Sequence, residues 1–173
     1  MSKPKLANPA LSISDADLTS ALAQIGAEID HQPLRSSALA RIMRETFHGS
    51  DAGGAWDWRM AYDLMQAAAV QVLLRGADAA GDIAAAKLLA SRLLTETRRS
   101  EQQIRLQQFS TPLPFAALVL RAAAIRKGET VLEPSAGTGA LAAFAVRAGA
   151  TLLLNEIDPF RQRLLRAVFG GEV

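Results

Sequence analysis

Cysteine is absent from this chain of 173 residues, which excludes disulfide bonds, thiolate metal sites and cysteine nucleophiles. Aromatic residues are scarce, at 5%, whereas hydrophobic residues reach 50% and are mainly alanine and leucine. This composition favours helices packed on helices over a β-sandwich, because the strands of a sandwich need β-branched and aromatic residues. The two histidines, His31 and His48, have no second ligand at metal-site spacing, so we expect no bound metal.

Long hydrophobic runs are missing as well. No apolar run approaches the roughly 20 residues that a membrane-spanning helix needs. The first ten residues contain two prolines and two lysines and lack the apolar core of a signal peptide. We therefore expect a soluble protein of the cytoplasm that does not contact a membrane.

The charges are unevenly distributed, although the net charge is only +2. Residues 97–128 contain six basic residues and one acidic residue, whereas the segments on either side are slightly acidic. A basic segment is typical of a surface that contacts nucleic-acid phosphates, and also of a solvated helix face with arginines near helix ends. Both interpretations stay open.

The first hundred residues predict a small helical bundle. Apolar residues recur there in steps of three or four, which is typical of amphipathic helices, and a loop rich in glycine over residues 48–54 separates the second helix from the third. The predicted helices cover residues 14–30, 33–47, 56–74, and 78 to 94 with a possible extension to 106.

Two proline-containing segments predict helix starts in the second part of the chain. Thr111 and Pro112 fit the N-cap and the first residue of a helix that ends near Lys127, because proline suits the first helical turn. Asp158 and Pro159 predict the start of a last helix in the same way, with the aspartate as its N-cap.

Two short β-prone segments, residues 130–133 and 151–155, flank a predicted helix over residues 140–148. So short a strand–helix–strand unit implies a crossover between parallel strands. The predicted fold class is therefore α/β but predominantly helical. An N-terminal helical domain, residues 1–106, precedes an incomplete Rossmann-like unit, residues 107–173.

The residues that follow the two strands predict a ligand site, because ligands of open α/β sheets bind at the carboxyl ends of the strands. Gly137 and Gly139 allow a sharp turn and close approach of the backbone to a ligand. The helix after them points its free N–H groups at that ligand. Glu156 follows the second strand, where a carboxylate can accept hydrogen bonds from both hydroxyls of a ribose.

Residues 134–139 form a second glycine-containing segment, called the glycine loop below. Residues 137–142 formally match the dinucleotide pattern G-x-G-x-x-A, which leaves a nucleotide-binding Rossmann unit as an alternative. Glu133, however, ends the first strand where it would repel a pyrophosphate. S-Adenosylmethionine has no phosphate and carries a sulfonium and an ammonium group, so it suits an acidic site better than NAD does.

Three motifs carry a resemblance to a known family. Residues 131–139, Val-Leu-Glu-Pro-Ser-Ala-Gly-Thr-Gly, resemble motif I of class I S-adenosylmethionine-dependent methyltransferases, in the form found in N6-adenine DNA methyltransferases. Residues 155–159, Asn-Glu-Ile-Asp-Pro, resemble motif II, and residues 109–112, Phe-Ser-Thr-Pro, are similar to the motif that precedes motif I in the γ-type order. The combination resembles plasmid- and phage-borne proteins in which such a methyltransferase is joined to a strawberry-notch-type helicase.

The resemblance covers residues 107–173 and implies roles for individual residues. It assigns Thr111 to the methionine moiety, Glu156 to the ribose hydroxyls and Ile157 to packing on the adenine. The residues that it places along the cofactor loop are Glu133, Pro134, Ser135, Ala136, Gly137 and Gly139. Two alternatives stay open, namely that Thr111 only starts a helix and that Glu156 is only a surface acid.

The resemblance is incomplete. The family transfers the methyl group with an Asn/Asp/Ser-Pro-Pro-aromatic motif, and no Pro-Pro pair occurs in this sequence. We therefore expect residues 1–173 to be the N-terminal part of a longer protein, or a short protein whose sheet is completed by a second copy. In either case we expect no methylation by this chain alone.

The resulting hypothesis is a cofactor-binding fragment of a methyltransferase that acts on adenine N6 in DNA, with S-adenosylmethionine as cofactor and DNA as the partner of the whole protein. Two alternatives remain. The acceptor could be RNA or a protein, because motif I does not identify it, or residues 1–106 could be a non-catalytic interaction module.

Overall fold

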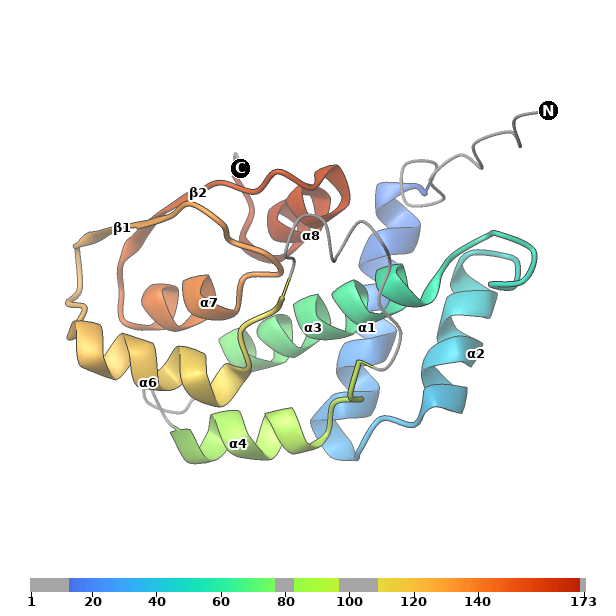
Figure 1. Ribbon diagram of the computed structural model, residues 1–173, viewed down its shortest axis with the longest axis horizontal. Helices are drawn as coiled ribbons and strands as arrows, with labels where there is room; N and C mark the ends of the chain where they lie inside the picture. The colour runs from blue at the N-terminus through green and yellow to red at the C-terminus, as the bar shows by residue number, and fades with distance from the viewer. Residues whose placement is uncertain (1–12, 77–82, 97–108, 172–173) are drawn as a thin grey trace.

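The computed structural model describes residues 13–76, 83–96 and 109–171, which form a predominantly helical protein with one two-stranded parallel sheet (Figure 1). The helices are α1 (Asp15–His31), α2 (Ser36–Thr46), α3 (Trp58–Arg75), α4 (Ile83–Ser91), α6 (Leu113–Ala123), α7 (Ala140–Arg147) and α8 (Pro159–Phe169). The strands are β1 (Thr130–Glu133) and β2 (Thr151–Leu154). Within the described ranges, no helix combines the length and apolar character that spanning a bilayer requires.

The predicted helices of the N-terminal part are confirmed as α1, α2 and α3. Ser14 starts α1, because its hydroxyl accepts a hydrogen bond from the N–H of Asp17 at 3.1 Å. The apolar residues of α1 then form one buried stripe that packs against α3, namely Leu18, Leu22, Ile25 and Ile29.

Helix α3 runs through the middle of the molecule and contacts α1, α7 and α8 (Figure 1). Asp57 caps it by accepting a hydrogen bond from the N–H of Met60 at 2.7 Å. The apolar core around α3 is continuous and includes Phe144 of α7 and Phe160 of α8. The predicted boundary at residue 106 lies outside the described residues, and the division into two domains stays a prediction.

The strand–helix–strand crossover is confirmed. Strands β1 and β2 pair in parallel, with Thr130 opposite Thr151 and Glu133 opposite Leu154. Helix α7 connects the strands and packs against the face of the sheet that carries Val131. The side chains on the opposite face are exposed.

Two helices end earlier than predicted. Helix α4 ends at Ser91, because the backbone leaves the helix there and the carbonyl of Arg92 accepts a hydrogen bond from the N–H of Leu34 at 2.8 Å. The rest of its predicted extension, residues 97–106, lies outside the described residues. Helix α6 ends at Ala123 rather than Lys127, because Ala124 adopts the left-handed conformation with φ of 50°.

Thr111 is not the N-cap of α6, contrary to the prediction. Pro112 occupies that position, and its carbonyl accepts hydrogen bonds from the N–H groups of Phe115 and Ala116. The proline in the first turn of α6 is therefore Pro114, whose missing N–H costs no helical hydrogen bond there. The prediction for α8 is confirmed, since Asp158 caps it and accepts hydrogen bonds from the N–H groups of Phe160 and Arg161.

Candidate functional site

The loop after β1 is tied to the end of β2, as the parallel crossover predicts. The N–H of Ala136 donates to the carbonyl of Asn155 at 2.9 Å, and the side-chain amide of Asn155 donates to the carbonyl of Pro134 at 2.9 Å. These two bonds hold residues 134–136 against the first residue after β2. The two segments therefore form one surface at the carboxyl edge of the sheet.

The two glycines of this loop adopt left-handed conformations, with φ of 59° at Gly137 and 92° at Gly139. Side chains disfavour this region, which explains the glycines. Gly139, the N-cap of α7, has a second constraint, because a Cβ there would lie 2.5 Å from a ring carbon of Phe169. A Cβ at Gly137 would meet no atom within 4 Å, so its surroundings leave room beside the backbone.

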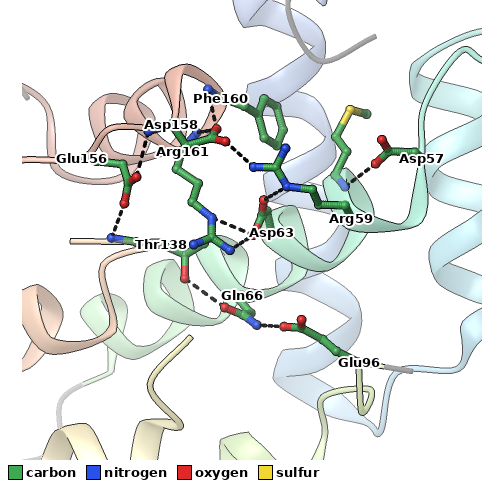
Figure 2. A network of polar contacts seen from close by, with 12 residues as sticks. Asp57, Arg59, Asp63, Gln66, Glu96, Thr138, Glu156, Asp158, Phe160 and Arg161 are labelled. Carbon is green, nitrogen blue, oxygen red and sulfur yellow. Dashed lines mark hydrogen bonds and ion pairs between the residues drawn. The ribbon is translucent and has the colours of Figure 1, made fainter. Parts of the chain in front are cut away.

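Glu156 organises the loop from the end of β2. One carboxylate oxygen accepts a hydrogen bond from the N–H of Gly137 at 2.7 Å, and the other accepts one from the N–H of Asp158 at 2.8 Å (Figure 2). The residue is only 7% exposed, so the alternative of a surface acid is wrong. An ionised carboxylate has about four acceptor positions, which leaves capacity for a ligand hydroxyl.

Ile157 next to Glu156 is 73% exposed. A large aliphatic side chain at the end of a strand, unshielded from water, provides an apolar surface beside the carboxylate. An exposed apolar group and a carboxylate with spare acceptor positions suit a ligand that combines a flat ring with a separate group bearing hydroxyls.

Glu133 lies at the other strand end and is half-buried. It lines a cavity of about 170 Å³ between β1, α6 and α7. Burial raises the pKa of its carboxyl group, and a hydrogen bond from the N–H of Ser135 opposes that rise. A cation placed beside Glu133 would stabilise the ionised carboxylate and lower its pKa.

Thr111 lines a larger cavity of about 430 Å³ on the α3 side of the glycine loop. Thr138 and Ala140 of the loop and α7 form its opposite wall, and Gln66 of α3 and Glu96 contribute polar groups. Glu133, Glu156 and Ile157 do not line this cavity. The structure thus brings Thr111 to the loop, but on a different side from the strand-end residues.

A polar stripe on α3, which the sequence analysis missed, contacts both the glycine loop and the start of α8. Arg59, Asp63 and Gln66 follow one another at intervals of four and three residues, so they lie on one face of the helix. All three contact the second half of the chain (Figure 2). The contacts are Arg59 with Asp158, Asp63 with Arg161, and Gln66 with Thr138.

The charges of this stripe are buried. Arg161 donates two hydrogen bonds to one oxygen of Asp63, at 3.0 and 2.7 Å, and the two residues are 3% and 1% exposed. Burial acts to lower the pKa of Arg161, but the carboxylates of Asp63, Glu156 and Asp158 together outweigh it and hold this pKa above its usual value. Burial raises the pKa of Asp63, and the guanidinium groups of Arg161 and Arg59 oppose that rise.

Four described basic residues of the second half are exposed. Arg166 lies on α8, whereas Arg121, Arg126 and Lys127 of the basic segment lie at the end of α6 and in the turn before β1. The other members of the basic segment, Arg98, Arg99 and Arg105, lie outside the described residues. Among the described residues, no group of three or more histidine, aspartate or glutamate side chains could hold a metal ion.

The fold and the site together define a predominantly helical protein in which a glycine loop between two parallel strands is held by a central helix. Comparison with known proteins assigns no family, since no family model, no curated protein and no solved structure matches this chain significantly.

Proposed function

We propose that this chain binds S-adenosylmethionine at the carboxyl ends of β1 and β2, as the cofactor-binding part of a methyltransferase. The proposal depends on one observation, namely that the three motif-like segments come together around the loop after β1. Glu156 of the second motif bonds to Gly137 of the first, and Thr111 of the third shares a cavity with Thr138. The three segments are separate in the sequence, and the fold brings them together as the resemblance implies.

The charges around the loop support a cationic ligand over a phosphate. Glu133 and Glu156 lie at the two strand ends, and Glu96 lies in the neighbouring cavity. Among the described residues, neither that cavity nor the loop over residues 133–139 contains a lysine or an arginine. The charged side chains of the cavity and of this loop are therefore all negative, so they would repel a pyrophosphate and attract a sulfonium and an ammonium group.

The roles proposed for individual residues follow from their surroundings. Glu156 keeps the acceptor capacity for ribose hydroxyls, and Ile157 exposes the apolar surface for the adenine ring. Pro134, Ser135, Ala136, Gly137 and Gly139 form the loop whose backbone approaches the cofactor. Glu133 faces the cationic part of the ligand.

The acceptor that we propose for the methyltransferase is adenine N6 in DNA, with RNA or a protein as the alternative. The exposed Arg121, Arg126 and Lys127 support a polyanionic partner, because they are free to approach phosphates. Residues 1–173 contain no Pro-Pro-aromatic motif to hold an acceptor amine, so the proposal for this chain is cofactor binding alone.

Isothermal titration calorimetry with S-adenosylhomocysteine, S-adenosylmethionine and NAD tests this function. We expect saturable binding of the first two and none of NAD. Glu156→Gln should weaken the binding about tenfold, since a charge-assisted hydrogen bond to the ribose is lost. Glu45→Gln, which changes an exposed carboxylate on α2, is the matched control and should bind normally. Binding of NAD alone, or of no compound, would contradict the proposal.

A further inference from the structure

The cavity of about 430 Å³ beside the glycine loop has walls from both halves of the chain. Met65, Gln66 and Ala69 of α3 form one side, and residues 93–96 and 109–113 form others. Most of these side chains are apolar. Glu96 is the single ionisable residue among the described residues that line the cavity. A carboxylate beside apolar walls strongly favours a cationic partner, because the low dielectric strengthens their attraction.

The side chain of Gln66 connects this carboxylate to the glycine loop. Its amide nitrogen donates a hydrogen bond to Glu96, and its amide oxygen accepts one from the hydroxyl of Thr138 at 3.1 Å (Figure 2). Because the amide is held at both ends, Gln66 has a defined orientation. Thr138 is 3% exposed and cannot move without disturbing the loop. The position of Glu96 is thereby set relative to the predicted cofactor loop.

Ser110 adds a second polar feature to the cavity wall. Its hydroxyl oxygen is buried and has no hydrogen-bond partner among the described residues. An unsatisfied buried hydroxyl is costly, and a ligand with a polar group in the cavity would satisfy it. Thr95 and Thr111 contribute further hydroxyl groups to the same walls. The cavity therefore combines one anion, several hydroxyls and apolar surface.

We propose that Glu96, oriented by Gln66, is the counter-ion for the primary ammonium group of the cofactor's amino-acid end. The identity of the cofactor rests on the proposed function, but the assignment of Glu96 rests on the cavity. An ammonium group there would donate a charge-assisted hydrogen bond to Glu96 and has further protons for the hydroxyls of the wall. The helical N-terminal half then contributes a ligand-contacting residue that lies outside all three motifs.

The test compares two ligands that differ only at the ammonium group. They are S-adenosylhomocysteine and its analogue without the α-amino group, titrated into the full chain and into Glu96→Gln. We expect the unchanged protein to prefer S-adenosylhomocysteine by about tenfold, the effect of one charge-assisted hydrogen bond. Glu96→Gln should remove this preference by weakening S-adenosylhomocysteine binding, with the affinity for the analogue unchanged.

A second variant separates the charge of Glu96 from its orientation by Gln66. Gln66→Met removes both hydrogen bonds of the amide but retains the carboxylate, so we expect it to reduce the preference only partly. Circular dichroism checks that both variants fold, and Glu45→Gln is the control for a lost surface charge. An equal loss for both ligands in Glu96→Gln, or an unchanged preference, would overturn the assignment of Glu96. Failure of the unchanged protein to bind either ligand would instead refute the proposed function.

Discussion

Helix α3 and the two-stranded sheet differ sharply in how they are surrounded. In α3, 12 of 18 residues are buried, including two charged ones. None of the eight residues of β1 and β2 is buried, and Leu132 and Leu153 are 66% and 55% exposed. Among the described helices and strands, the two strands next to the predicted site are thus the least buried, and α3, which packs against the start of α8 and the loop, is the most buried.

This contrast shows what holds the candidate site in place. A two-stranded parallel sheet with one open face has little stability of its own. Helix α3 holds the surroundings of the sheet instead, because Gln66 bonds to Thr138 of the loop, and Arg59 and Asp63 pair with Asp158 and Arg161 at the start of α8. Buried ion pairs are weak evidence for stability, because removing two charges from water costs about as much as their attraction returns. We therefore interpret the main role of the stripe as positioning the loop and the start of α8 rather than stabilising the fold.

The largest effect is expected from breaking the buried charge pair. Asp63→Asn leaves the guanidinium of Arg161 without its counter-ion in a buried place, and should lower the free energy of unfolding by about 3–5 kcal/mol. Urea denaturation measures this loss. The matched control removes the exposed pair of Arg41 and Glu45 through Glu45→Gln and should cost less than about 1 kcal/mol. Similar losses in both variants would contradict the importance of the stripe.

The next comparison truncates one leucine in each region. Leu64→Ala in α3 removes a side chain with 0% exposure and should cost about 2–5 kcal/mol of unfolding free energy. Leu153→Ala on the open face of the sheet should change stability by no more than about 0.5 kcal/mol. Thermal unfolding of the two variants provides the measurement. A large loss for Leu153→Ala would show that something covers this face in solution, such as a second copy of the chain.

The two glycines of the loop give a smaller difference. Gly137→Ala should lower the free energy of unfolding by about 1–2 kcal/mol, because alanine must adopt the left-handed conformation there. Its Cβ has room and adds no clash. Gly139→Ala additionally places its Cβ against the ring of Phe169, and should cost about 1–3 kcal/mol more. Denaturation midpoints of both variants test the order. The reverse order would mean that the contact between α8 and the loop is absent.

The smallest effect concerns pH. Burial raises the pKa of Glu133, so its carboxylate becomes protonated at a higher pH than an exposed glutamate does. A sulfonium attracts the ionised form alone, so the affinity for S-adenosylmethionine should fall relative to that for S-adenosylhomocysteine, whose thioether sulfur carries no charge, as the pH drops through this pKa. Glu133→Gln should make the affinity ratio independent of pH. A ratio that stays constant in the unchanged protein would remove Glu133 from the cation site.

Much of the fold follows from local sequence signals. The apolar steps in α1 predict its buried stripe, and Asp158 with Pro159 predicts the start of α8. The two short β-prone segments predict the crossover, which in turn places Gly137 beside Glu156. These features depend on neighbouring residues or on one short connection, so a single sequence contains enough information.

Other features depend on contacts that the sequence does not reveal. Asp63 and Arg161 are separated by 98 positions, and only the packing of α8 on α3 brings them together. The polar spacing of Arg59, Asp63 and Gln66 in an otherwise apolar helix was the available signal. The end of α6 was missed because Ala124 adopts a left-handed conformation that glycine normally provides, while Gly128, the glycine after the predicted end at Lys127, lies in the turn before β1.

Backbone NMR of the isotope-labelled chain with S-adenosylhomocysteine tests the central claim most directly. The account predicts saturable shifts of the amide signals of Gly137, Gly139 and Ile157, with smaller shifts for Gln66 and Thr138 on the α3 side. The amides of α2 should not change. Absent shifts, or shifts confined to helices away from the loop, would contradict a cofactor site at the carboxyl ends of β1 and β2.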